Sequence, residues 1–387
     1  RTEQRVMIRY EGTDTPLEVP FGSLEEMRQA FDQTHRKQFG FRDDRGRIIE
    51  SIAVEAIAEG ESEAADFGGD SRQSPGKPLA ESRVYENGRW RQVPTWRRSD
   101  LPLQQQLEGP LLVIEDNATT LIGSNWNGAV DDLGHLVLTR ASSASDSLKV
   151  TADADPIMLE VFNNLFMHIA EQMGVVLERT AHSVNIKERL DFSCALFDGD
   201  GGLVANAPHM PVHLGSMGQS VCAVIRRFGD QLADGDSFVL NAPYDGGTHL
   251  PDVTVVTPFF GDDSQKPELF VASRAHHADI GGITPGSMPP GSRNIDEEGI
   301  LINPSRLVSA GRFLEEEMLR MLGSGDHPAR NPQQNLADLK AQLAANAKGL
   351  SEIAAMMQHY GRETVAAYMD HVQDNAEQAV RTAIGAL

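Results

Sequence analysis

Histidine and aspartate side chains gather in the middle of the chain, where their types and spacing suit metal chemistry. Five of the 12 histidines lie between residues 209 and 277. They fall in three short segments, residues 206–218, 241–256 and 273–292, that combine histidine with Gly or Pro and often with Asp. Turns at the ends of strands often carry binding and catalytic residues. These segments are therefore the candidates for a functional site.

Two of the segments contain sets of possible metal ligands. His249 and Asp252 are three residues apart, and the intervening Pro251 bends the chain so that both side chains could reach one ion. The sequence His276-His277-Ala278-Asp279 offers two imidazoles and a carboxylate. Nitrogen and carboxylate ligands without thiolates suit Zn, Mn or Fe(II). Two imidazoles with one carboxylate leave coordination positions open, which is typical of a catalytic site.

Other polar residues in or near these segments could have either a structural role or a role in the site. We expect His209 and His213 to be hydrogen-bonding residues of turns that could also support a site or touch a substrate. Asp191 is a turn carboxylate or a site residue, and Asp279 could orient a neighbouring imidazole instead of binding a metal. These four residues are the candidate catalytic groups. Cys194 lies in an apolar run and is predicted to be a small buried residue rather than a nucleophile.

The composition excludes several classes of protein. Asp and Glu number 56 against 34 Lys and Arg, a formal charge of −22 that disfavours binding to nucleic acid. The only two cysteines, Cys194 and Cys222, exclude a disulfide scaffold and fit a reducing compartment, so we expect a cytoplasmic protein. No apolar run approaches the ~20 residues of a membrane helix. Neither a Walker A nor a GxGxxG pattern occurs, so no nucleotide site is predicted in this chain.

The helices and strands predicted around these residues indicate an α+β protein. Residues 1–140 read as a small β-rich module with one helix, which begins at a capping box of Ser23 and Glu26 and ends at Gly40. Residues 141–156 are a polar linker. Residues 157–387 read as a mixed α/β domain, with a long helix first, a glycine-rich β centre, and a helical C-terminal part from Arg312 onward.

Four segments together resemble the hydantoinase B/oxoprolinase family. They are residues 189–217, 241–260, 273–292 and 331–349, and they match the family in order over about residues 150–387. Residues 281–292 look most like the ATP-dependent 5-oxoprolinases. The first ~140 residues look like the C-terminal end of a hydantoinase A-type subunit, which is fused to the B-type part in oxoprolinases. The chain, which begins with Arg rather than Met, therefore resembles the middle of such a fusion.

The resemblance implies a chemistry and a ligand set. In this family the A-type part uses ATP and Mg²⁺ to phosphorylate an amide, lactam or enolate oxygen, and the B-type part completes hydrolysis or carboxylation. Carried onto this chain, the divalent-metal ligands are His249, Asp252 and a later imidazole, His276 or His277. One departure is Ala242, because the family often has Asn-Asp-Pro where this chain reads Asn241-Ala242-Pro243. Any role of that acid is absent here.

The expected activity is the ATP-dependent opening of 5-oxoproline or a hydantoin to an amino acid. The expected partners are a hydantoinase A-like ATP-binding domain, a small lactam substrate and further copies of the same chain. Two alternatives stay open: a subunit of a ketone carboxylase of the acetone or acetophenone type, and a non-catalytic docking subunit. The resemblance also implies that this chain alone has no ATP-dependent turnover.

Overall fold

The chain folds into two compact units. The computed structural model describes residues 1–11, 13, 16–58, 77–86, 88–101, 103–141, 151–207, 209–261 and 264–386. The smaller unit comprises Arg1 and Ala56–Lys149, and the larger unit comprises Thr2–Glu55 and Val150–Leu387. Helices and sheets both contribute, so the predicted α+β class is confirmed. In the described part of the chain, no helix has the length and apolar character needed to cross a membrane.

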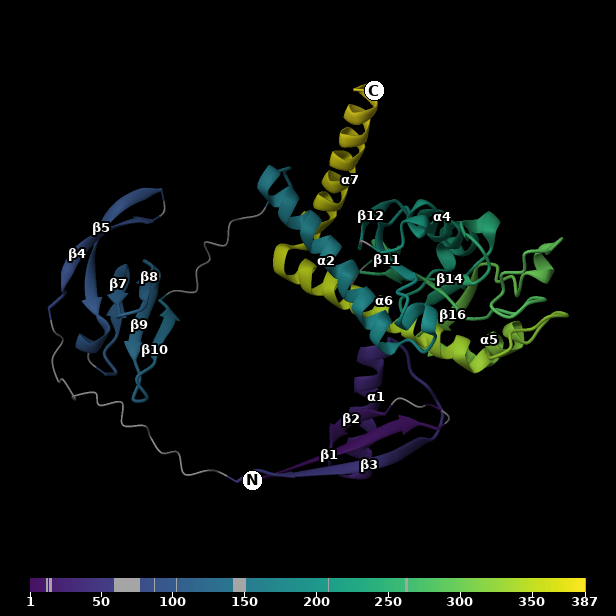
Figure 1. Cartoon of the computed structure of the whole chain (residues 1–387), viewed down its shortest axis with the longest axis horizontal. Helices are drawn as coiled ribbons and strands as arrows, with labels where there is room; N and C mark the ends of the chain where they lie inside the picture. Colours follow the sequence, from purple (N-terminus) through teal and green to yellow (C-terminus); the bar gives the residue numbers. More distant parts are fainter. Residues whose placement is uncertain are drawn as a thin grey trace. The chain divides into compact units, whose positions relative to one another are not determined.

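The smaller unit consists of two small sheets (Figure 1). The four-stranded sheet has the order β4-β5-β7-β8, and its strands are β4 (Ala80–Glu86), β5 (Arg89–Arg97), β7 (Leu111–Ile114) and β8 (Thr119–Ile122). The three-stranded sheet has the order β10-β9-β6, from β10 (Leu136–Arg140), β9 (Trp126–Val130) and β6 (Leu107–Glu108), and a 3-10 turn, η1 (Arg98–Asp100), precedes β6. A core of Leu, Ile and Val side chains fills this unit.

The N-terminal segment forms a sheet with a helix against it. The sheet has the order β2-β1-β3, from β1 (Thr2–Tyr10), β2 (Leu17–Pro20) and β3 (Arg47–Ala56). Helix α1 (Leu24–Phe39) begins where Ser23 and Glu26 form the predicted capping box. It ends at Gly40, whose φ of 77° is a left-handed conformation that glycine adopts without a steric penalty.

This N-terminal segment packs into the larger unit, which differs from the predicted module of residues 1–140. Val6 and Ile8 of β1 and Phe31 of α1 share one core with residues of the central sheet such as Val239 and Val253. The apolar face of α1 is buried against this core, and the other residues of the core lie far away in the sequence. Most of the predicted linker of residues 141–156 lies outside the described residues.

A seven-stranded antiparallel sheet forms the centre of the larger unit. Its order is β12-β11-β15-β14-β13-β16-β17. The strands are β11 (Phe192–Asp198), β12 (Leu203–Asn206), β13 (Ser237–Leu240), β14 (Asp252–Phe259), β15 (Leu269–His276), β16 (Ser305–Ser309) and β17 (Arg312–Phe313). Three 3-10 turns connect parts of this region, namely η2 (Gly229–Gln231), η3 (Pro243–Asp245) and η4 (Ile295–Glu297). The predicted glycine-rich β centre thus corresponds to the core of one sheet.

Helices cover both faces of this sheet (Figure 1). They are α2 (Pro156–Thr180), α3 (Val184–Lys187), α4 (Pro211–Phe228), α5 (Glu315–Leu322), α6 (Pro332–Tyr360) and α7 (Arg362–Gly385). Alternate residues of β11 face opposite ways: Cys194 and Leu196 pack with α2 and α6, whereas Ala195 and Phe197 pack with α4. The C-terminal part is helical as predicted, except that Arg312 and Phe313 form the short strand β17.

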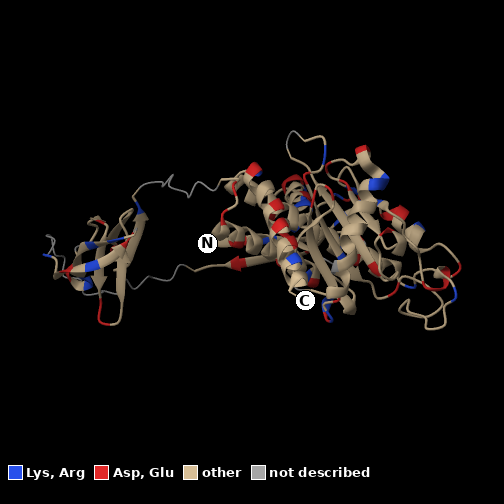
Figure 2. Cartoon of the chain, turned by 90° about the horizontal axis from the view of Figure 1, so that it is seen from above, with Lys and Arg blue, Asp and Glu red and all other residues tan. Residues whose placement is uncertain are grey.

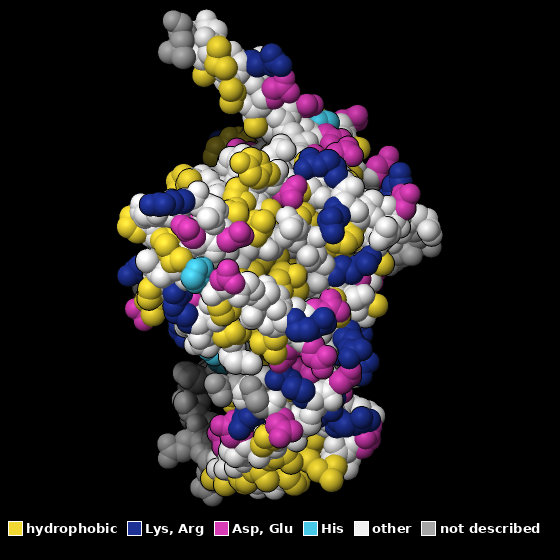
Figure 3. Space-filling model, turned by 90° about the vertical axis from the view of Figure 1, so that its right-hand side faces the viewer, with side chains coloured by type: hydrophobic (Ala, Val, Ile, Leu, Met, Phe, Trp, Pro, Cys, Tyr) yellow, Lys and Arg dark blue, Asp and Glu magenta, His cyan; other side chains and the backbone are white. Residues whose placement is uncertain are grey.

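Polar side chains of α6 hold it to the sheet. Gln342 donates hydrogen bonds to the carbonyl oxygens of Val253 and Ser273, and Asn346 donates one to Val255. All five residues are fully or almost fully buried. On the surface, acidic and basic side chains are interspersed (Figures 2 and 3).

Candidate metal centre

The site lies where three neighbouring strands bring their ends together. Strands β14 and β15 are antiparallel, and their register places Asp252 opposite His276. Strand β11 pairs with the other side of β15, so that Asp191, just before β11, lies beside His276. The backbone N–H of His276 donates a hydrogen bond to the carbonyl oxygen of Asp191, with a distance of 3.0 Å. Residues that are up to 85 positions apart in the sequence are thus adjacent.

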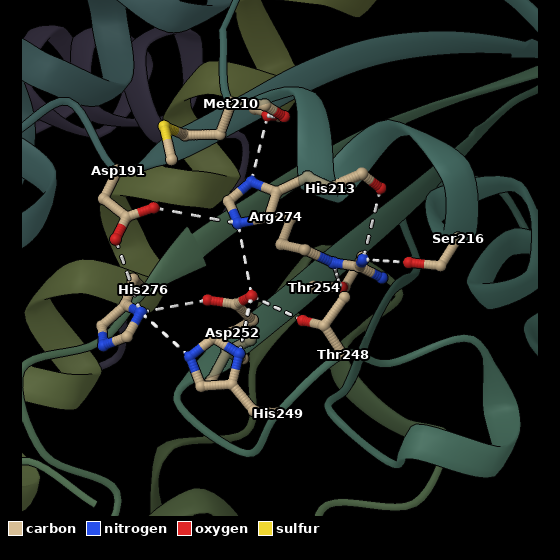
Figure 4. Close-up of polar contacts among 12 residues, drawn as sticks. Asp191, Met210, His213, Ser216, Thr248, His249, Asp252, Thr254, Arg274 and His276 are labelled. Carbon is tan, nitrogen blue, oxygen red and sulfur yellow. Dashed lines mark hydrogen bonds and ion pairs between the residues drawn. The ribbon is translucent and has the colours of Figure 1, made fainter. Parts of the chain in front are cut away.

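Asp252 is the centre of a cluster of imidazoles (Figure 4). One of its oxygens, Oδ2, lies 3.2 Å from Nε2 of His213 and 3.2 Å from Nδ1 of His249. The other, Oδ1, lies 3.2 Å from Nδ1 of His276. Asp252 is only 1% exposed. The predicted convergence of His249 and Asp252 is therefore present in the structure.

Asp191 and His213 complete the cluster from the neighbouring elements. Asp191 Oδ1 lies 3.8 Å from Nε2 of His213, and its Oδ2 lies 3.5 Å from Nδ1 of His276. His213 is in the first turn of α4 and is buried, while its Nδ1 is 3.0 Å from the hydroxyl of Ser193. The ring of His213 thus lies between the two carboxylates on one side and Ser193 of β11 on the other. Asp191 is the more accessible carboxylate, with 28% of its side chain exposed.

The surroundings keep Asp252 ionised. Burial raises its pKa, but the close contacts of His213, His249 and His276 and the hydrogen bond from Thr248 outweigh burial and lower the pKa far below the usual range. The hydrogen bond with Asp252 raises the pKa of His249, although burial opposes this. A carboxylate that stays charged while it is buried is a strong ligand for a cation.

Three of these residues fit a divalent cation. One ligand atom from each of His249, Asp252 and His276 can be chosen so that all lie within 4.8 Å of one another. Among the described atoms, Asp252 Oδ1 is buried and has no hydrogen-bond partner of good geometry. Such an oxygen in a polar site calls for an ion or a water molecule. Two imidazoles and one carboxylate match the ligands of Zn, Mn or Fe(II).

Arg274 lies behind the cluster and is fully buried. Its guanidinium donates hydrogen bonds to the hydroxyls of Thr254, Ser216 and Ser220, and to the carbonyl oxygen of Gly246. No carboxylate of the described residues is within ion-pair distance of it. Burial lowers its pKa to about 10, against the attraction of Asp252. Arg274 therefore ties α4 and the turn before Thr248 to the sheet.

The structure does not bring His277, Asp279 and His209 into this cluster. His277 is fully buried on the α6 side, with Nε2 3.1 Å from Gln342 Oε1 and Nδ1 3.0 Å from Asn335 Nδ2. Burial lowers its pKa. Both of its ring nitrogens therefore have partners other than a metal, which separates it from His276. His209 approaches the backbone N–H of Cys194 with its Nδ1 atom and packs on Phe192.

Asp279 anchors a loop instead of orienting an imidazole. It accepts hydrogen bonds from the backbone N–H groups of Gly281, Gly286 and Arg330, and from the Arg330 guanidinium. Burial raises its pKa, but these bonds lower it overall. The glycine-rich loop of residues 281–292 is thus fixed at its start by a structural carboxylate.

Sequence reasoning missed Thr248, Ser193 and Arg274. Thr248 donates its hydroxyl to Asp252, and Ser193 holds the imidazole of His213. The signal for Arg274 was available, because a charged residue interrupts the apolar strand of residues 269–275. Cys194 is fully buried as predicted, and burial raises its pKa, so its thiol stays protonated.

Comparison with known proteins agrees with this architecture. The family model described as hydantoinase B/oxoprolinase matches residues 155–387. The chain is 41% identical to 5-oxoprolinase 1 of Arabidopsis thaliana, over 98% of this chain and 31% of that protein. It is 41% identical to 5-oxoprolinase of Dictyostelium discoideum, over 97% of this chain and 29% of that protein. The chain therefore spans about a third of the length of these relatives.

Solved structures show the same fold. The ATP-dependent caprolactamase of Pseudomonas jessenii matches with a TM-score of 0.54 and 28% identity, over 59% of this chain and 38% of that chain. An acetone carboxylase matches with a TM-score of 0.50 and 17% identity, over 56% of this chain and 28% of that chain. The family match covers more than half of the residues. It includes every member of the histidine–aspartate cluster, which consists of Asp191, His213, His249, Asp252 and His276. The chain belongs to the hydantoinase B/oxoprolinase family.

Proposed function

We propose that this chain carries the divalent-metal site of an ATP-dependent hydrolase that opens a cyclic amide, 5-oxoproline or a close relative. The observation that supports this most directly is the cluster of His249, Asp252 and His276 in a chain 41% identical to a 5-oxoprolinase. Residues 157–387 are then the hydantoinase B-like domain. Residues 1–140 are the C-terminal part of a hydantoinase A-like region, whose remaining part uses ATP and Mg²⁺.

The roles of the residues follow from their positions. His249, Asp252 and His276 would hold the cation, which when bound supplies a Lewis acid that polarises a carbonyl oxygen and makes water more acidic. His213 orients Asp252 from behind, since its Nε2 lies 3.2 Å from Oδ2 of that carboxylate. Asp191 is the partly exposed carboxylate beside two of the imidazoles, and we assign it the role of general base that takes a proton from water.

Opening a lactam with water needs both the ATP-dependent phosphorylation and the metal site. A lactam carbonyl is a poor electrophile, and ATP-dependent phosphorylation of its oxygen would make the carbon open to attack. Water then adds to the carbon while Asp191 takes its proton, and the C–N bond breaks as that proton passes to the ring nitrogen, which leaves as an amine. The resulting acyl phosphate is hydrolysed by a second water to a carboxylate and inorganic phosphate. The contacts of Thr248 and His213 with Asp252 would hold this arrangement before the reaction begins, which is how preorganised sites lower a barrier.

Neither alternative has a specific observation in its favour. The acetone carboxylase match at 17% identity shows a shared fold and says nothing about the reaction. A docking subunit would not need a buried ionised carboxylate surrounded by three imidazoles. We therefore propose the hydrolase rather than the ketone carboxylase or the docking subunit.

The test uses the full-length protein that contains this chain. ADP release is measured with 5-oxoproline, hydantoin and caprolactam, and separately with acetone plus bicarbonate. We expect ADP release with a cyclic amide and a large loss of that activity in Asp252→Asn. ADP release that depends on ketone and bicarbonate, with none for any cyclic amide, would contradict the hydrolase and favour the carboxylase.

A further inference from the structure

A large cavity lies in the larger unit, away from the histidine–aspartate cluster. Its volume is about 860 Å³, which is within the range typical of small-molecule sites. It is bounded by α1 and β1, by the end of α2 and by the start of α6, and Figure 1 shows α1 beside that end of α2. None of its lining residues belongs to the cluster. The cavity is therefore a space distinct from the cluster.

The inner wall of the cavity is apolar. Tyr10, Phe31 and Phe39 contribute side chains that are almost fully buried, and Leu336 of α6 adds another. His35 lies among these rings and is 9% exposed. Burial lowers its pKa to about 4, so that it is neutral at pH 7 and belongs to the apolar wall. An organic body, rather than an inorganic ion alone, would fit against this surface.

The rim of the cavity carries an excess of positive charge. Four lining residues are Lys or Arg, whereas one, Asp43, is acidic. Two of the cations are neutralised by two carboxylates: Arg45 lies 2.5 Å from Asp43, and Lys340 lies 3.1 Å from Glu315. The other two, Arg179 and Lys187, make no ion pair within the described part of the chain. Arg179 and Lys187 are therefore the two lining cations whose charge is available to a ligand.

Arg179 and Lys187 come from the same corner of the fold. Arg179 is in the last turn of α2 and Lys187 ends α3, and both side chains are exposed. The amide side chains of Gln38, Gln333 and Gln334 also line the cavity. The start of α6 adds the positive end of its helix dipole. Arginine, lysine and amide groups at one opening form the usual environment for a carboxylate or a phosphate.

We propose that this cavity binds a small organic anion. The carboxylate or phosphate group lies at the rim against Arg179 and Lys187, and the organic body lies against the wall formed by Tyr10, Phe31 and Leu336. This site is additional to the metal centre, and it does not depend on the proposed hydrolase activity. It would give the protein a second recognition point for an acidic metabolite.

The test measures binding of three probes to the purified chain by calorimetry and by ligand-observed NMR at low ionic strength. They are 5-oxoproline, which has a carboxylate, inorganic phosphate, and 2-pyrrolidinone, the neutral lactam without the carboxylate. We expect saturable binding of at least one anionic probe and none of 2-pyrrolidinone. Arg179→Ala/Lys187→Ala should weaken the binding about tenfold or more, because it removes two charge-assisted contacts. Binding of 5-oxoproline alone assigns a carboxylate ligand, and binding of phosphate alone assigns a phosphorylated one.

Two controls make the result specific. Arg226→Ala/Arg227→Ala removes the same charge from exposed positions at the end of α4 that do not line the cavity, and it should leave binding unchanged. An equal loss in this control, or no saturable binding of either anion, would overturn the proposal. So would loss of anion binding in Asp252→Asn with retention in Arg179→Ala/Lys187→Ala, because the anion would then lie at the metal centre. Metal binding, measured separately, should be unchanged in Arg179→Ala/Lys187→Ala.

Discussion

Nε2 of His249 lies 3.2 Å from Nδ1 of His276, although the two residues are 27 positions apart in the chain. Two imidazole nitrogens at this distance either share a proton or direct their lone pairs toward one cation. His249 Nδ1 and His276 Nδ1 also each lie 3.2 Å from an oxygen of Asp252. A cation bound by both nitrogens would take the place of the direct contact between the two rings.

We expect the purified chain to bind about one equivalent of Zn, Mn or Fe(II), and Asp252→Ala to lose it. Removing Asp252 takes away the charged ligand and leaves three imidazoles without their common partner. Metal content after dialysis, measured by inductively coupled plasma mass spectrometry, tests this. His168→Ala is the matched control, since His168 is an exposed histidine of α2, and it should keep the metal. Equal metal content in the wild type and Asp252→Ala would refute the site.

His213→Gln should weaken metal binding without abolishing it. His213 touches Asp252 from behind and is held by Ser193, so its loss disorients a ligand instead of removing one. Partners of this kind typically change metal affinity by about 10–100-fold. Titration with a competing chelator measures the affinity. A loss as complete as that of Asp252→Ala would show that His213 is itself a ligand.

Asp191→Asn should reduce turnover of the full-length protein while the metal stays bound. The amide is almost the same size as the carboxylate but cannot accept a proton from water at neutral pH. We expect kcat for a cyclic amide to fall by about 10²–10⁴-fold, which is typical for loss of a general base. Steady-state ADP release and metal analysis on the same sample test this. Unchanged kcat would exclude Asp191 as the base.

Arg274→Met should destabilise the larger unit. The guanidinium is fully buried, and its loss leaves the carbonyl oxygen of Gly246 and several hydroxyls with fewer partners. Each unsatisfied buried group costs about 1–3 kcal/mol, so a total of roughly 3 kcal/mol is expected. Urea unfolding followed by circular dichroism measures the free energy of unfolding. Arg274→Lys should recover part of it, and a variant as stable as the wild type would contradict this role.

His35 should make stability fall as the pH drops. Burial lowers its pKa from 6.5 to about 4, so the folded state favours the neutral ring. The stabilising contribution is fully present above pH 6.5 and is lost progressively as the pH falls toward 4, by up to about 3 kcal/mol. The free energy of unfolding of His35→Gln should depend less on pH over this interval. Parallel pH dependences of variant and wild type would exclude this effect.

Several features of the fold were predictable because they depend on neighbouring residues. The capping box of Ser23 and Glu26 and the left-handed Gly40 set the ends of α1 by local hydrogen bonds. The spacing of His249 and Asp252 similarly predicted that both side chains meet, and they do so at 3.2 Å. The packing of residues 2–55 with the larger unit was not predictable, because it depends on apolar contacts between α1 and distant strands.

The sequence by itself determined that imidazoles and carboxylates occur in three segments and that His249 and Asp252 lie within reach of each other. Only the tertiary structure places His276, and not His277, beside Asp252. Consecutive residues at the end of a strand point to opposite faces of the sheet. The register of β15 with β14 turns His276 toward Asp252, and His277 consequently lies against Gln342 of α6. That choice depends on strand pairing over long sequence distances, which the local spacing of histidines does not encode.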